Sequence, residues 1–111
     1  MQEQVEVVVQ SLGTDNIYPK MGQTVRVHYT CRLENGRVFD STYARQKPFT
    51  FKLGAGAVVP GWEEAVKQLC VGEKANCVIP ASLAYGAKGV QGLIPPHSKL
   101  YLELELLSIL L

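Results

Sequence analysis

The reactive side chains of this chain are few, and their spacing fits none of the common catalytic arrangements. Its serines and cysteines lack the G-x-S-x-G or cysteine–histidine context that activates a nucleophile. The carboxylates Asp40, Glu63 and Glu64 do not form a recognisable acid and base pair. The sequence therefore argues against covalent catalysis.

The same pattern argues against a bound metal or cofactor. The chain has three cysteines, an odd number, without C-x-x-C spacing, and neither His28 nor His97 has a metal-binding pattern beside it. The glycine-rich stretch 54–56 is too short for a phosphate-binding fingerprint. We expect no metal and no cofactor.

The side chains that remain are aromatic and aliphatic residues close to expected loops. They are Tyr29, Phe39, Phe49, Val58, Val59, Trp62, Tyr85, Leu93 and Ile94. One interpretation is that all of them are ordinary core residues. The other is an apolar pocket with a few polar groups, among them the Asp40 carboxylate and the Tyr85 hydroxyl. Composition alone leaves both interpretations open.

A short helix must position the centre of this set. Pro60 suits a first helical turn, and Glu63 is spaced to pair with Lys67 one turn later. Trp62, Ala65, Val66 and Leu69 recur at helical spacing and predict one apolar stripe. Because so short a helix is marginal alone in water, the surrounding strands must supply its packing.

Alternating apolar and polar residues predict those strands. The pattern is clear at 5–10, 24–34, 49–53 and 100–106, and shorter strands are expected at 37–40 and 74–79. Asn35 and Gly36 predict a hairpin with a type I′ turn, which needs positive φ at both residues. The fold class is therefore α+β, with five or six mainly antiparallel strands in a curved sheet around one short helix.

The bulk properties limit the function further. A chain of 111 residues is expected to form one domain, 1–111, and its net charge of +1 offers no electrostatic case for binding nucleic acid or an anionic membrane. No apolar run reaches the length that spans a bilayer, and the first residues lack a signal-peptide pattern. We expect a cytoplasmic monomer whose cysteines are buried free thiols.

Six runs of the sequence, in order, resemble the FKBP-type peptidyl-prolyl cis–trans isomerases, the macrolide-binding immunophilins. They are GQTVRVHYT at 22–30, GRVFDS at 36–41, KPFTF at 47–51, VVPGWEE at 58–64, AYG at 84–86 and LIPPH at 93–97. The resemblance implies a sheet wrapped around the helix, an apolar pocket between them, and an enzyme that accelerates rotation about X–Pro bonds without a metal.

The resemblance also implies which residues form the site. Asp40, Tyr85, Tyr29 and Phe39 would take part in catalysis. The residues that would contact substrate or inhibitor are Tyr29, Phe39, Asp40, Arg45, Phe49, Val58, Val59, Trp62, Tyr85, Leu93, Ile94 and Leu102. The implied ligands are proline-containing peptides and proteins, macrolides of the tacrolimus and rapamycin type, and a signalling protein bound through the macrolide complex.

Several positions depart from the family pattern. Leu102 stands where a pocket aromatic is common, Val90 replaces a frequent histidine and Cys31 a usual glycine. Two alternatives therefore stay open. The chain could be a catalytically weak binding module that holds a partner protein with the pocket and the 80–97 loop, or a carrier of small apolar ligands.

Overall fold

The two longest alternating segments form the centre of the sheet. In the computed structural model, which describes residues 4–13 and 16–110, β2 spans Thr24–Arg32 and β6 spans Leu100–Leu110. The two strands pair antiparallel, from Thr24 opposite Leu110 to Arg32 opposite Tyr101. Their apolar positions face the core, as alternation requires.

Further strands extend the sheet on both sides of this pair. β5, Lys74–Ile79, pairs with β6, and β1, Glu6–Ser11, pairs with β5 at one edge. On the other side, β3 (Val38–Ser41) and β4 (Phe49–Lys52) both pair with β2. The strand order is β1-β5-β6-β2-β3, with β4 also on β2, so the predicted α+β class and antiparallel sheet are confirmed.

The two short strands share one edge of β2. β3 pairs with residues 30–32 and β4 with residues 24–27, so they follow one another along the same strand. The segment 42–48 must therefore turn back beside β2 to connect them. This placement brings the loop after β3 close to Tyr29, between the two pairings.

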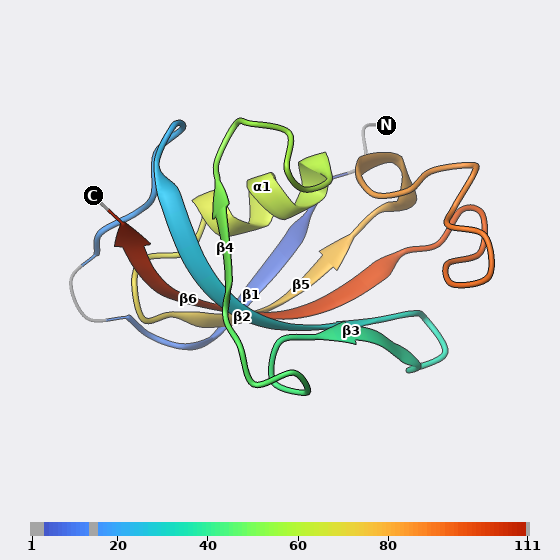
Figure 1. The fold of residues 1–111 in the computed structure, drawn as a ribbon, viewed down its shortest axis with the longest axis horizontal. Coiled ribbons are helices and arrows are strands. Elements are labelled where there is room, and N and C mark those ends of the chain that lie inside the picture. Colours follow the sequence, from blue (N-terminus) through green and yellow to red (C-terminus); the bar gives the residue numbers. More distant parts are fainter. Residues whose placement is uncertain (1–3, 14–15, 111) are drawn as a thin grey trace.

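The helix α1, Pro60–Lys67, lies inside the curve of the sheet (Figure 1). Trp62, Ala65 and Val66 are buried on one face, as predicted. Gly61 permits this close packing, because a Cβ atom there would lie 2.2 Å from Cγ2 of Ile79. The buried leucines of β6 face the same core.

Three local predictions were wrong. Lys67 pairs with Glu64, its Nζ 3.0 Å from Oε1, whereas the Glu63 carboxylate accepts a hydrogen bond from the Gly54 backbone. The hairpin at Asn35–Gly36 forms, but only Gly36 has positive φ (+90°), so the loop is a type I turn followed by a bulged glycine.

The third difference lies in β1. Val9 was expected on the inner face with Val5 and Val7, but it is exposed. The pairing of β1 with β5 shifts register between Val9 and Ser11, which turns the end of the strand outward.

Hydrogen bonds between its own backbone groups hold the long 80–97 segment in shape. It starts with a 3₁₀ turn, η1, at Ala81–Leu83, and the His97 N–H donates to the Gly86 carbonyl at 2.9 Å. Val90 and Ile94 form an isolated antiparallel bridge. The segment therefore folds back on itself beside the sheet.

Candidate active site

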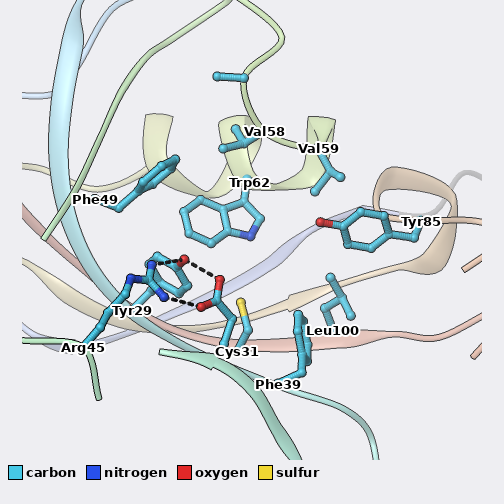
Figure 2. A pocket seen from close by; sticks show the side chains of 12 residues that line it. Tyr29, Cys31, Phe39, Arg45, Phe49, Val58, Val59, Trp62, Tyr85 and Leu100 are labelled. Atoms are coloured by element: carbon cyan, nitrogen blue, oxygen red, sulfur yellow. Dashed lines mark hydrogen bonds and ion pairs between the residues drawn. The ribbon is translucent and has the colours of Figure 1, made fainter. Parts of the chain in front are cut away.

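A cavity of about 350 Å³ opens between the first turn of α1 and the inner face of the sheet (Figure 2). Its lining comes from β2, β3, β4 and β6, from the start of α1, and from the loops that follow β3, precede α1 and follow η1. Its lining residues are Tyr29, Cys31, Phe39, Asp40, Arg45, Phe49, Ala57, Val58, Val59, Trp62, Tyr85 and Leu100. Nine of these side chains belong to the set that the sequence and the resemblance predicted.

Trp62 is held rigidly by aromatic neighbours. Its ring packs edge-on against Tyr29, with centroids 4.6 Å apart and planes at 84°. Phe49 and Phe51 make similar edge contacts with centroids 6.2 and 6.1 Å from the Trp62 ring. Such pairs are favourable beyond the area they bury. The indole is therefore a fixed apolar surface in the cavity.

One side of the cavity carries a cluster of three polar side chains. The Tyr29 hydroxyl donates to Oδ2 of Asp40 at 2.5 Å and accepts a hydrogen bond from Nη2 of Arg45 at 2.8 Å. Arg45 also forms an ion pair with Asp40, and its guanidinium lies 5.5 Å from the centroid of the Tyr29 ring. The Asp40 carboxylate thus has both oxygens engaged and is fixed in direction.

The electrostatics of this cluster favour a protonated tyrosine. Burial, reinforced by the hydrogen bond to Asp40, raises the pKa of Tyr29 to about 12. The hydrogen bonds that Arg45 makes to Tyr29 and Asp40 raise the pKa of Arg45. Near neutral pH, Tyr29 is therefore a hydrogen-bond donor and Arg45 a cation, and both face the Asp40 side chain.

Two hydrogen-bond donors at the other side of the cavity are free. The Tyr85 hydroxyl points into the cavity (Figure 2) and has no hydrogen-bond partner among residues 4–13 and 16–110. Burial raises the pKa of Tyr85, so its hydroxyl stays protonated near neutral pH. Val59 precedes α1, and its backbone N–H also lacks an acceptor within the described part of the chain.

Cys31, Ala57 and Leu100 line the cavity although reasoning from the sequence had not placed them there. Cys31 and Leu100 lie on the inner faces of β2 and β6, and alternation alone assigned them to the core. Both residues lie near one end of their strand, which was the available signal. Desolvation raises the pKa of Cys31 to about 12, so it enters the pocket as a neutral thiol.

Three expected contact residues lie elsewhere. Leu93 and Ile94 line a second groove of about 600 Å³, together with residues of the hairpin 33–37 and of the segment 88–96. Leu102 is buried in the core, opposite Cys31 on β2 and Cys77 on β5. On β6 the cavity is therefore lined by Leu100, the inward-facing residue that precedes Leu102.

No three metal-binding side chains come together among residues 4–13 and 16–110. The same residues include no helix with the length and apolar character needed to cross a membrane. The three cysteines are buried and free.

Comparison with known proteins agrees with this geometry. The family model described as FKBP-type peptidyl-prolyl cis-trans isomerase matches residues 15–107. The chain is 47% identical over 105 residues to the Drosophila melanogaster peptidyl-prolyl cis-trans isomerase Fkbp12, covering 95% of this chain and 97% of that protein.

Two yeast proteins are similar to the same extent. The chain is 46% identical over 105 residues to FK506-binding protein 1 of Kluyveromyces lactis, covering 95% of this chain and 92% of the relative. It is 46% identical over 99 residues to FK506-binding protein 1 of Saccharomyces cerevisiae, covering 89% and 87%. The chain therefore belongs to the FKBP-type peptidyl-prolyl cis–trans isomerases.

Proposed function

We propose that the cavity on Trp62 is where this peptidyl-prolyl cis–trans isomerase accelerates rotation about X–Pro bonds. The observation that carries the proposal is the arrangement around the cavity. A rigid apolar floor lies between two free donors on one side and the fixed Tyr29, Asp40 and Arg45 cluster on the other. Such a site binds one flat apolar ring and orients the amide beside it.

The chemistry requires no nucleophile. An X–Pro amide is planar by resonance, with a rotation barrier of about 18–20 kcal/mol. In the twisted transition state this resonance is lost, so the carbonyl oxygen and the nitrogen lose charge separation. A dry apolar pocket therefore favours the twisted state over the planar ground state, which is the differential binding that lowers a barrier.

We assign roles to the polar groups on this basis. The Val59 N–H and the Tyr85 hydroxyl would hold substrate carbonyls, because both are donors without partners among the described residues. Asp40 would act electrostatically on the twisting amide, since Tyr29 and Arg45 hold its charge in one place. Phe39 would close the apolar wall beside it.

The ligands follow from the same site. We propose that it takes proline-containing peptides and proteins, and that macrolides of the tacrolimus and rapamycin type compete for the cavity. Two similar proteins carry the name FK506-binding protein 1, which supports macrolide binding here. We also propose that residues 1–111 form one isomerase domain and that the protein is cytoplasmic, since three buried free thiols fit a reducing compartment.

A second candidate is a weak isomerase that holds a partner protein. The groove of about 600 Å³ along the 88–96 segment and the 33–37 hairpin supports it, because a protein or a macrolide-linked signalling partner could contact that surface. Tight macrolide binding with negligible isomerase activity would favour this candidate.

A protease-coupled assay on a proline tetrapeptide tests the main proposal. We expect the chain to accelerate cis-to-trans conversion, a macrolide to abolish the acceleration, and Tyr85→Phe to lower kcat/KM about tenfold, the scale of one lost hydrogen bond to a substrate. Tyr18→Phe is the matched control, because Tyr18 lies outside the cavity lining and is exposed. Absence of acceleration by the unmodified chain would contradict the proposal.

A further inference from the structure

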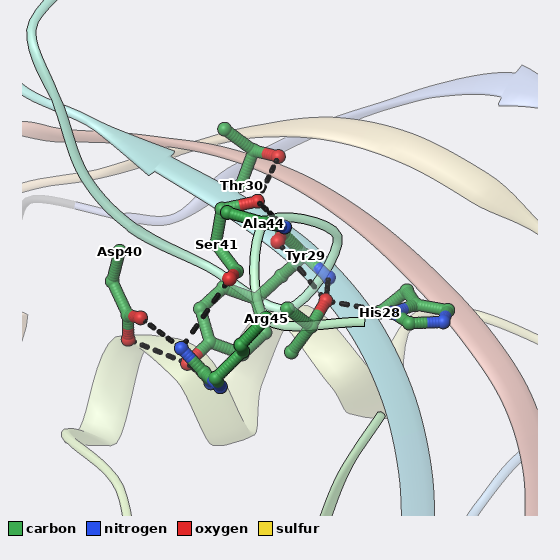
Figure 3. A network of polar contacts seen from close by, with 8 residues as sticks. His28, Tyr29, Thr30, Asp40, Ser41, Ala44 and Arg45 are labelled. Carbon is green, nitrogen blue, oxygen red and sulfur yellow. Dashed lines mark hydrogen bonds and ion pairs between the residues drawn. The ribbon is translucent and has the colours of Figure 1, made fainter. Parts of the chain in front are cut away.

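Thr42 is a fully buried polar residue directly beside the polar cluster of the cavity. It follows β3 and begins the 42–48 segment that carries Arg45. Its hydroxyl oxygen lies 2.7 Å from the Tyr29 backbone nitrogen, 3.2 Å from the Tyr29 carbonyl oxygen and 2.7 Å from Nδ1 of His28. Figure 3 shows the surrounding network, with His28, Tyr29, Asp40 and Arg45 labelled. One side chain thus contacts the backbone of a pocket residue and the ring of its neighbour.

The single hydroxyl proton limits how these contacts are made. Thr42 Oγ1 accepts the Tyr29 N–H and donates its own proton to the Tyr29 carbonyl, which also accepts the Thr42 backbone N–H at 3.0 Å. The second lone pair of Oγ1 accepts from His28 in the tautomer that carries the ring proton on Nδ1. In that arrangement one hydroxyl satisfies all three contacts.

These bonds join the loop to β2 at Tyr29. The Lys47 N–H donates to the Thr42 carbonyl at 3.1 Å, which closes the loop around Arg45. From this loop the guanidinium reaches back to the Tyr29 hydroxyl and to Asp40. Thr42 therefore anchors both ends of the cluster, the backbone of Tyr29 and the segment that presents Arg45.

The next residue holds the loop from the outer face of the sheet. The Tyr43 ring stacks on His28, with centroids 4.5 Å apart and planes at 17°. Its hydroxyl donates to Oε1 of Glu105 on β6 at 3.0 Å. Because Thr42 is anchored inward and Tyr43 outward, the start of the loop has little freedom to move.

We infer that Thr42 is a positioning residue of the isomerase site, whose hydroxyl fixes Arg45 and Asp40 relative to Tyr29. The inference rests on the proposed function, in which this cluster acts on the twisting amide. Without the hydroxyl, the Tyr29 N–H and His28 Nδ1 lose their partner in a buried place, and the loop must shift for either group to find another.

Two substitutions at one position test the role of the hydroxyl. Thr42→Val keeps nearly the same shape without the hydroxyl and is expected to lower kcat/KM about tenfold, the scale of a buried donor left unsatisfied. Thr42→Ser keeps the hydroxyl and is expected to stay within about twofold of the unmodified chain. Thr24→Val, on β2 with Tyr29 but at the far end of that strand from the loop, is the matched control.

A double-substitution cycle separates positioning from general destabilisation. If Thr42 acts through Arg45, then Thr42→Val combined with Arg45→Ala loses no more activity than Arg45→Ala alone. The inference would be overturned if the fold losses in kcat/KM of the two single variants multiplied in the double variant. Full activity of Thr42→Val would overturn it as well. Assays run well below each variant's unfolding temperature. If Thr42→Val is too unstable to assay, Thr42→Ala carries the same expectations.

The outcome for the proposed function is read separately. An unmodified chain without isomerase activity contradicts the proposed function itself. An active chain whose Thr42→Val variant is equally active contradicts only the role of Thr42.

Discussion

At the scale of single residues, Cys31 is the feature that most distinguishes this pocket. Its side chain lies in the cavity beside the Trp62 ring, yet it is only 2% exposed. Desolvation is the main cause that raises its pKa to about 12, and the nearby charge of Asp40 acts in the same direction. The thiol therefore adds volume to the pocket floor without adding charge.

This environment predicts a thiol that resists alkylation. The thiolate is the reactive form, and a thiol with a pKa near 12 is almost fully protonated at pH 8. We expect iodoacetamide to leave Cys31 unmodified in the folded chain at pH 8, and to modify it rapidly in denaturant. Peptide mapping by mass spectrometry measures this.

Cys77 provides the comparison. Cys77 has the same raised pKa of about 12 and lies away from the cavity lining, so it should be equally slow in the folded chain. Rapid modification of Cys31 alone under native conditions would contradict the assignment and would indicate a more open pocket.

The roles proposed for Asp40 and Tyr85 depend on opposite features of their surroundings. Asp40 is useful because its partners hold it in one direction, whereas Tyr85 is useful because its hydroxyl has no partner among the described residues. A pocket that fixes its charge and leaves its donors free is prepared for a ligand before the ligand arrives.

At the scale of elements, α1 positions the site with only two turns. It has no side-chain cap at its N-terminus, so its stability comes from packing and from the fixed φ of Pro60. The same first turn carries Trp62 and follows the free Val59 N–H. A shift of this turn would therefore move the floor and one donor of the pocket together.

Gly61→Ala tests that dependence. The added Cβ would lie 2.2 Å from Cγ2 of Ile79 and 2.9 Å from the Leu83 carbonyl oxygen, so the turn must move away from β5 and η1. We expect a loss of about 1–3 kcal/mol in the free energy of unfolding. Macrolide affinity should fall with it, because the shift displaces Trp62 and Val59.

Urea denaturation and fluorescence titration of Trp62 measure the two effects. The control is Glu64→Ala on the exposed face of the same helix, which removes a surface ion pair with Lys67 and should cost less than about 1 kcal/mol. Unchanged stability in Gly61→Ala would show that the helix is less tightly seated than its contacts indicate.

At the scale of the whole molecule, four weakly acidic groups make stability depend on pH in the alkaline range. Desolvation is the main cause that raises the pKa values of Tyr29, Tyr43, Cys31 and Cys77, each to about 12. Their ordinary values are 10 for tyrosine and 9 for cysteine. The folded chain therefore retains protons that the unfolded chain has already released.

The sign of the effect follows from that difference. Below about pH 9 both states are protonated and the full stabilisation is present. Between pH 9 and 12 the unfolded chain binds fewer protons, so the free energy of unfolding falls as pH rises. We expect the melting temperature to decrease steadily across this range, as measured by circular dichroism.

Tyr43→Phe provides the internal check. It removes one of the four titrating groups, so its melting temperature should decline less steeply between pH 9 and 12. A melting temperature that stays constant from pH 9 to pH 12 in the unmodified chain would contradict the assignment of these groups.

The sequence by itself determined the local elements of this protein. Alternation located the strands and their inner faces, as in the leucines of β6, and helical spacing located the buried face of α1. These patterns are visible because a side chain's direction is set by the backbone period within a few residues. The family runs, such as VVPGWEE at 58–64, indicated the activity and named nine of the residues that line the cavity.

The tertiary structure alone decided how these elements meet. β3 and β4 share one edge of β2, which opens the cavity over Cys31 and Leu100 instead of Leu102 and brings Thr42 to the Tyr29 backbone. These outcomes depend on contacts between residues far apart in the chain, which no local pattern records.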